Sequence, residues 1–163
     1  MMAAMQLRHD LHYASSPDEV LAMMLEPAFW DRVAGSTGAL SSTTTVEGTA
    51  AGTSVVTREV QPMAGVPAFA RKIAGETTEV VKRLTWQGFE CSVVIESPGK
   101  PTSLSGCATL AADGEGTRLT YDLDARASVP LLGNRLEKLV VQLTTDGLDT
   151  EHAVGVAWLR GER

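Results

Sequence analysis

Hydrophobic and polar residues alternate along much of the chain with a period of two, which is typical of half-buried strands. The opening run places Leu7, Leu11 and Tyr13 in one phase and polar residues in the other. A region rich in β-branched residues, interrupted by Gly, Ala and Thr, predicts a hairpin over 39–62. The runs at 89–96 and 118–125 alternate most regularly. The pattern predicts strands in the segments 6–15, 39–62 (two strands), 77–88, 89–101, 102–116 and 117–130.

Helical spacing interrupts this strand pattern in three places. After the first strand, Ser16 is a suitable N-cap, with Pro17 at the first helical position and Glu19 completing a capping box. Pro27 is expected to break or kink this helix near Glu26. A short helix is expected within 65–76, and a long one from Leu131 to about Arg160. The order of elements predicts an α+β domain in which a curled antiparallel sheet wraps around the C-terminal helix.

The last helix carries an apolar face that is expected to cover the sheet. Near its centre lies Gly147, although glycine destabilises a helix by roughly 1 kcal/mol relative to alanine. The hypothesis is that Gly147 leaves a notch that enlarges a ligand cavity. The alternatives are a close approach of Trp86 or Tyr121, or a kink. Gly155 points more outward and is assigned no role. The predicted covering face consists of Leu132, Leu136, Leu139, Val140, Leu143, Val154 and Trp158.

A second apolar stripe follows the back of the same helix around His152. It is expected to pack against the short helix within 65–76. A homodimer that covers the stripe is the alternative. The stripe consists of Val141, Leu148, Val156 and Leu159.

Composition narrows the classes of partner. A formal net charge of -6 without a Lys/Arg cluster argues against nucleic acid. No run reaches the roughly 20 apolar residues of a membrane span, and the start of the chain does not resemble a secretory signal, so a cytoplasmic location is expected. Residues 1–163 are expected to form one domain. Cys91 and Cys107 have no zinc-ligand spacing and fall in opposite strand phases, so neither a metal, a cofactor nor a disulfide is expected.

Several stretches carry a resemblance to known proteins. The order of elements resembles the helix-grip fold of the START and polyketide-cyclase superfamily. Within it, "REVQPMAGVPAFARKIAGETTEVVKRLTW", "SPGKPTSLSG" and "DGEGTRLTYDLDARASVPLLGNRLEKLV" look like an uncharacterised bacterial family, the domain of unknown function numbered 2505, and "LRHDLHYASSPDEVLAMMLEPAF" fits as well. The resemblance implies a cavity between sheet and last helix that holds sterols, lipids or polyketides in related families. It implies no set of catalytic residues.

Residues on the inner phases of the predicted elements are candidates for the cavity wall. Three polar residues in these phases are candidate anchors: His9 as an acid, base or orienting donor, and Arg58 and Lys82 for a carboxylate or phosphate. For each, a structural role is the alternative: a satisfied buried histidine, or a pairing with an acid such as Glu79. The expected wall consists of Leu11, Val56, Trp86, Val93, Leu119, Tyr121, Leu136, Leu143 and Gly147.

Three functions are compatible with these patterns. The first is non-enzymatic binding or transport of a small hydrophobic molecule, such as a lipid, a polyketide or an isoprenoid. The second is a protein-interaction or homodimerising module without a ligand. The third is a cyclase- or aromatase-like enzyme, although the chain shows no motif of a nucleophile beside a base, and no residue is assigned a catalytic role. The binding function is preferred.

Overall fold

The computed structural model describes residues 4–162. Its elements follow the order expected from the sequence, including the break in the first helical region. In chain order they are β1 Met5–Tyr13, α1 Pro17–Met24, α2 Pro27–Ser36, β2 Ser41–Thr49, β3 Gly52–Pro62, α3 Ala68–Ala74, β4 Thr77–Gln87, β5 Glu90–Glu96, β6 Thr102–Asp113, β7 Gly116–Ala127 and α4 Gly133–Leu159.

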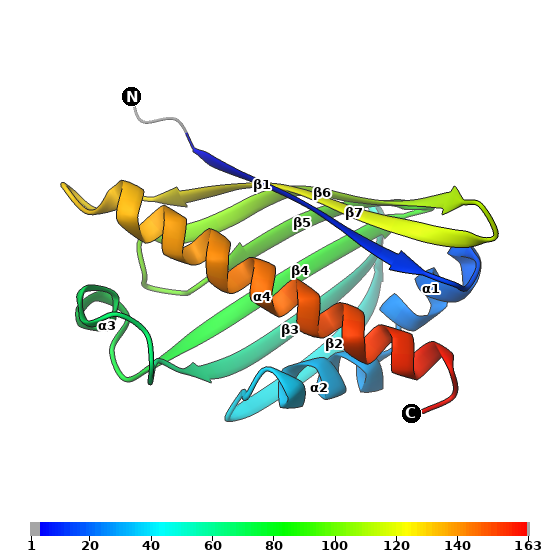
Figure 1. Cartoon of the computed structure of the whole chain (residues 1–163), viewed down its shortest axis with the longest axis horizontal. Helices are drawn as coiled ribbons and strands as arrows, with labels where there is room; N and C mark the ends of the chain where they lie inside the picture. The colour runs from blue at the N-terminus through cyan, green and yellow to red at the C-terminus, as the bar shows by residue number, and fades with distance from the viewer. Residues whose placement is uncertain (1–3, 163) are drawn as a thin grey trace.

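The seven strands form one antiparallel sheet in the order β1-β7-β6-β5-β4-β3-β2. Only the neighbours β1 and β7 are distant in sequence, and their pairing leaves β1 and β2 as the two edges. The sheet curves around α4, which crosses its concave side diagonally (Figure 1). This arrangement confirms the expected α+β helix-grip fold.

Local sequence explains the two helices that follow β1. The Ser16 hydroxyl accepts a hydrogen bond from the Glu19 backbone N–H, and the Glu19 side chain accepts one from the Ser16 backbone, which completes the predicted capping box. Pro27 ends this helical region and is itself the first residue of α2. The predicted break near Glu26 is therefore confirmed, and it produces two separate helices.

The strand alternation was predicted correctly for β5 and β7. Cys91, Val93 and Ile95 are buried on the inner face of β5, and Tyr121 and Leu123 are among the buried residues of β7. Cys107, which pairs in register with Ser92, is exposed on the other face, and both cysteines are free. Burial raises the pKa of the Cys91 thiol to about 12.

The orientation of α4 differs from the expected one. Leu136 and Trp158 are buried as predicted, but Leu143 is 45% exposed. The side packed most tightly on the core contains Leu148, Glu151 and Gly155 together with Trp158. A hydrophobicity pattern does not identify this stripe as buried, because it assigns neither glutamate nor glycine to a core. No helix within residues 4–162 is long and apolar enough to cross a membrane.

The stripe around His152 does not face outward. Leu148 is buried and the other three stripe residues pack against the main core. The His152 Nε2–H donates to the carbonyl oxygen of His12 in β1 at 2.7 Å. The expected packing of this stripe against α3 is therefore wrong. The small helix α3 contacts the beginning of α4 instead, where Ala70 clusters with Leu136 and Arg135 lies over the Phe69 ring.

Candidate functional site

A cavity of about 520 Å³ lies between α4, α3 and the sheet. It exists because α4 does not cover the sheet evenly: its strand partners are β1 and β7, on one side of the sheet, and its C-terminal half also packs against α1 and α2. The inner faces of β3, β4 and β5 are left open toward the first half of α4. Figure 1 shows α3 at the end of the molecule where α4 begins, away from α1 and α2.

Most of the wall is apolar. It combines α4 with the small helix α3, the loop before it, the four strands β3 to β6 and α2. A volume in this range and a mainly apolar lining are typical of sites that enclose a small organic molecule. The apolar wall includes Trp30, Val33, Met63, Val66, Ala70, Ile73, Val80, Ile95, Leu104, Leu136, Leu139, Val140, Leu143 and Leu148.

Gly147 opens directly onto this cavity. A Cβ atom built at Gly147 would have no heavy atom of the surrounding structure within 4 Å. The close approach of Trp86 or Tyr121, considered as an alternative from the sequence, is therefore absent at this position. The glycine leaves space in the wall that a larger side chain would fill.

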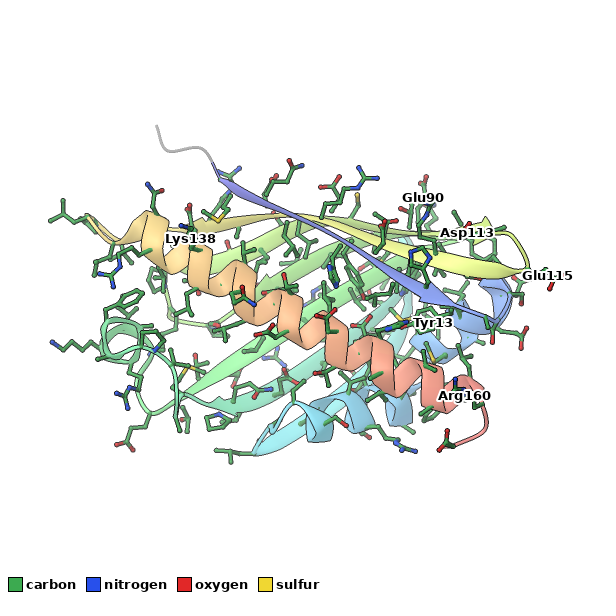
Figure 2. The ribbon with its side chains drawn as sticks, in the orientation of Figure 1. Tyr13, Glu90, Asp113, Glu115, Lys138 and Arg160 are labelled. Carbon is green, nitrogen blue, oxygen red and sulfur yellow. The ribbon has the colours of Figure 1, made fainter. Side chains whose placement is uncertain are left out.

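Gly155 is the glycine that permits close packing. A Cβ atom there would lie 2.7 Å from Tyr13 Cε1, 2.9 Å from Tyr13 Oη and 3.1 Å from Met23 Cε. Gly155 is buried, so the outward position expected from the sequence is wrong. Figure 2 shows Tyr13 between β1 and the C-terminal half of α4. The Tyr13 ring fits there only because residue 155 has no side chain.

One cation and one buried carboxylate meet beside the cavity. Lys82 of β4 lines the wall, and its Nζ lies 3.4 Å from Oε1 of Glu151, whose side chain is 0% exposed. The Tyr121 hydroxyl donates to Oε2 of the same carboxylate at 2.8 Å. The Lys82 ammonium also lies 4.7 Å from the centroid of the Trp30 ring. A buried carboxylate requires such compensation, because an unpaired charge is strongly disfavoured away from water.

The buried carboxylate affects the two tyrosines of the chain. Burial raises the pKa of Tyr121 well above its usual value, and the negative charge of Glu151 raises it further. The same two causes, burial first, raise the pKa of Tyr13. Both phenols are therefore neutral at neutral pH, which allows Tyr121 to donate its hydrogen bond.

Two buried polar atoms have no hydrogen-bond partner among the described residues: Tyr13 Oη and Trp86 Nε1. Neither residue belongs to the wall of the cavity. We assign them no role in binding.

The structure places four of the sequence-predicted residues in the wall: Lys82, Leu136, Leu143 and Gly147. Five others fill the core instead, because the C-terminal half of α4 packs down onto the sheet beside them. These five are Leu11, Trp86, Val93, Leu119 and Tyr121.

The remaining three predicted residues lie away from the cavity. Arg58 is on the outer face of β3, 58% exposed, and its Nη1 is 3.3 Å from Oε1 of Glu79. Val56 shares this outer phase, since Thr57 and Glu59 are the β3 residues that reach the wall. The inward position considered for Arg58 and expected for Val56 is thus wrong, and the alternative considered for Arg58, a pairing with Glu79, is the one found. His9 faces α4 and contacts Asp149 Oδ1 through Nε2 at 2.7 Å, outside the wall.

Sequence reasoning missed Glu151 and Trp30. Leu148, Glu151, Gly155 and Trp158 recur at alternating spacings of three and four, and this periodicity is the one signal that could have placed Glu151 on the packed side. Within residues 4–162, no three His, Cys, Asp or Glu side chains are grouped so that they could hold a metal ion. A second hollow of about 440 Å³ is an open groove between α2 and α4 that includes Arg32 and Ala153.

The curved antiparallel sheet around a long C-terminal helix, with a cavity between them, defines a protein with the helix-grip fold. The chain belongs to the family described as protein of unknown function DUF2505, whose model matches residues 8–159. No protein of curated function matches the sequence.

Solved structures share this fold at low sequence identity. The protein TTHA0849 from Thermus thermophilus is 17% identical, with a TM-score of 0.64 and coverage of 94% of this chain and 98% of that one. A STAR-related lipid transfer protein from Xanthomonas axonopodis is 18% identical, with a TM-score of 0.58 and coverage of 94% and 84%. StfQ, a di-domain aromatase/cyclase (ARO/CYC) of the steffimycin biosynthetic pathway, is 14% identical, with a TM-score of 0.66 and coverage of 95% and 50%.

Proposed function

We propose that this protein binds a small hydrophobic molecule, of the lipid, polyketide or isoprenoid kind, in the cavity between the sheet and α4. The observation that carries the proposal is the 520 Å³ cavity with its mainly apolar wall. Burying an apolar ligand there removes its surface from water, which supplies the driving force for binding.

Gly147 supports this function independently of the wall composition. A helix tolerates an internal glycine at a loss of roughly 1 kcal/mol relative to alanine. No neighbouring side chain uses the space that this glycine leaves. A bound ligand that occupies the space is a physical reason for the residue. Two structurally similar proteins are named as a lipid transfer protein and an aromatase/cyclase, and these names are compatible with the same class of ligand.

The interaction-module alternative loses its main support. It depended on an outward apolar stripe on α4, but Leu148 is buried, and Val141, Val156 and Leu159 pack against the core. The proposed binding function requires no such surface.

A neutral fluorescent probe tests the proposal. N-phenyl-1-naphthylamine should bind the wild-type protein with a rise in fluorescence, and Gly147→Leu should abolish this binding because the leucine side chain enters the cavity. Gly35→Leu is the matched control: Gly35 is also a helical glycine with open space around its Cβ position, but it is exposed and outside the wall. Circular dichroism would check that both variants fold.

The natural ligand requires a separate measurement. The protein is purified from its own host without detergent, its mass is measured under native conditions, and any bound molecule is extracted and identified. A co-purifying apolar molecule near one per chain is the expected result. In the probe experiment, a Gly147→Leu variant that binds N-phenyl-1-naphthylamine as tightly as the wild-type protein does, with unchanged stability, would refute the assignment of the cavity as the binding site.

A further inference from the structure

The charged residues of the cavity limit which head group a ligand can carry. The inference about this head group rests on the proposed binding function. Lys82 is the less exposed of the two lysines in the wall, with a side chain 21% exposed, whereas Lys100 is exposed. An ammonium has three N–H donors. Glu151 accepts from one side of Lys82, and the Trp30 ring covers another. The cavity adjoins the remaining side.

The charge of Lys82 is already balanced. Glu151 is completely buried, and its two carboxylate oxygens accept hydrogen bonds from Lys82 and Tyr121. Lys82 and Glu151 thus form an ion pair, in which Nζ and Oε1 are 3.4 Å apart. The pair of Lys82 and Glu151 therefore carries no net charge at the surface that it presents to a ligand.

We infer that the ligand presents a neutral hydrogen-bond acceptor, such as the carbonyl oxygen of a ketone or an ester, to the Lys82 ammonium. A carbonyl accepts a charge-assisted hydrogen bond without adding a charge to the site. A carboxylate at the same place would add a negative charge that Lys82 does not balance, because Glu151 already does so. A carboxylate that leaves water for this mainly apolar wall loses hydration, and Lys82, which is already paired, does not replace it.

The other charges of the wall act in the same direction. Apart from Lys82, the wall contains the carboxylates of Glu59, Glu96 and Asp146 and the ammonium of Lys100. Three carboxylates against one further cation give the wall an excess of negative charge. The excess repels an anionic head group and has no such effect on a neutral one.

Two compounds with the same undecyl chain test this inference: undecyl methyl ketone and dodecanoate. Both are measured by displacement of N-phenyl-1-naphthylamine at neutral pH. The wild-type protein should bind the ketone more tightly than dodecanoate by about tenfold or more, because the ketone gains a hydrogen bond to a charged donor without the electrostatic penalty.

Variants of the charged pair separate the two effects. Lys82→Met should weaken ketone binding by about tenfold, because it removes the donor. Arg83→Met is the matched control, since Arg83 is adjacent on β4 but exposed on the outer face, and it should leave ketone binding unchanged. Glu151→Gln keeps an acceptor for Tyr121 and removes the negative charge, so it should shift the preference toward dodecanoate by about tenfold or more.

Each outcome has a defined meaning. Wild-type protein that binds dodecanoate as tightly as the ketone overturns the inference, as does a Glu151→Gln variant with an unchanged preference. If Glu151→Gln does not fold, the double variant Lys82→Met with Glu151→Met removes both charges together, and it should bind the two compounds without the wild-type preference. A double variant that keeps the full preference overturns the inference. A wild-type protein that binds neither the probe nor either compound overturns the proposed function itself, whereas binding without a head-group preference overturns only this inference.

Discussion

The two glycines within α4 are predicted to respond in opposite ways to the same substitution. Gly147→Ala places a methyl group in open space, and Gly155→Ala places one against Tyr13 and Met23. Both variants gain roughly 1 kcal/mol of helix stability, because alanine restricts the unfolded chain more than glycine does. This gain is common to the pair, so the difference between the variants isolates the effect of packing.

The structure sets the size of that difference. A methyl group at Gly155 would lie 2.7 Å from Tyr13 Cε1, well inside van der Waals contact, and the buried tyrosine ring would have to move. Overpacking of this kind destabilises a protein by about 1–3 kcal/mol. We therefore expect Gly147→Ala to raise the free energy of unfolding by about 1 kcal/mol and Gly155→Ala to lower it by up to about 2 kcal/mol.

Urea unfolding followed by tryptophan fluorescence measures both values. The three tryptophans, Trp30, Trp86 and Trp158, are all buried and should report unfolding of the core. Equal slopes of the unfolding free energy against urea would show that the two variants expose similar surface. Equal stabilisation of the protein by both substitutions would refute the close contact between Gly155 and Tyr13. The same result would remove the distinction between Gly155, which permits close packing, and Gly147, which borders the cavity.

Two further predictions follow from the positions of charged and ionisable groups. Arg58→Met should leave binding of the neutral probe unchanged and alter the free energy of unfolding by less than about 0.5 kcal/mol. The reason is that Arg58 is exposed and forms only a surface pair with Glu79. Reduced binding in the probe titration would contradict the position of Arg58 on the outer face. The raised pKa values of Tyr13 and Tyr121 mean that the unfolded chain loses its phenolic protons at a lower pH than the native protein does. Stability should therefore be unaffected by these groups below a pH of about 10 and fall as the pH rises above it. Phenolate absorbance should then appear together with loss of native circular dichroism, and phenolate formation in the still-folded protein would contradict the burial of the tyrosines.

Local patterns were sufficient to predict most of the architecture. The alternation of inner and outer residues in β5 and β7 depends only on which face of the strand is covered, so it is visible before the strand partners are known. The capping box at Ser16 and the break at Pro27 involve neighbouring residues and are equally local. The same patterns put Lys82 on the inner face of β4 and predicted the notch at Gly147.

The outer position of Arg58 shows where such patterns fail in a strand. Residues of both phases of β3 are partly or fully covered, including Ser54 and Val55 next to each other. The alternation there does not identify the inner face. The register with β4 decides it, because Thr57 lies opposite Lys82 and Arg58 lies opposite Val81.

The sequence by itself determined the order of the elements, the strand faces with clear alternation, and the presence of a small residue where α4 borders the cavity. Only the tertiary structure decided which side of α4 packs on the core and which side borders the cavity. The packed side contains Glu151, whose burial is stable because Lys82 and Tyr121, respectively 69 and 30 residues away, supply its hydrogen bonds. A carboxylate is polar by every local measure, and its place in the interior depends on partners that only folding brings to it.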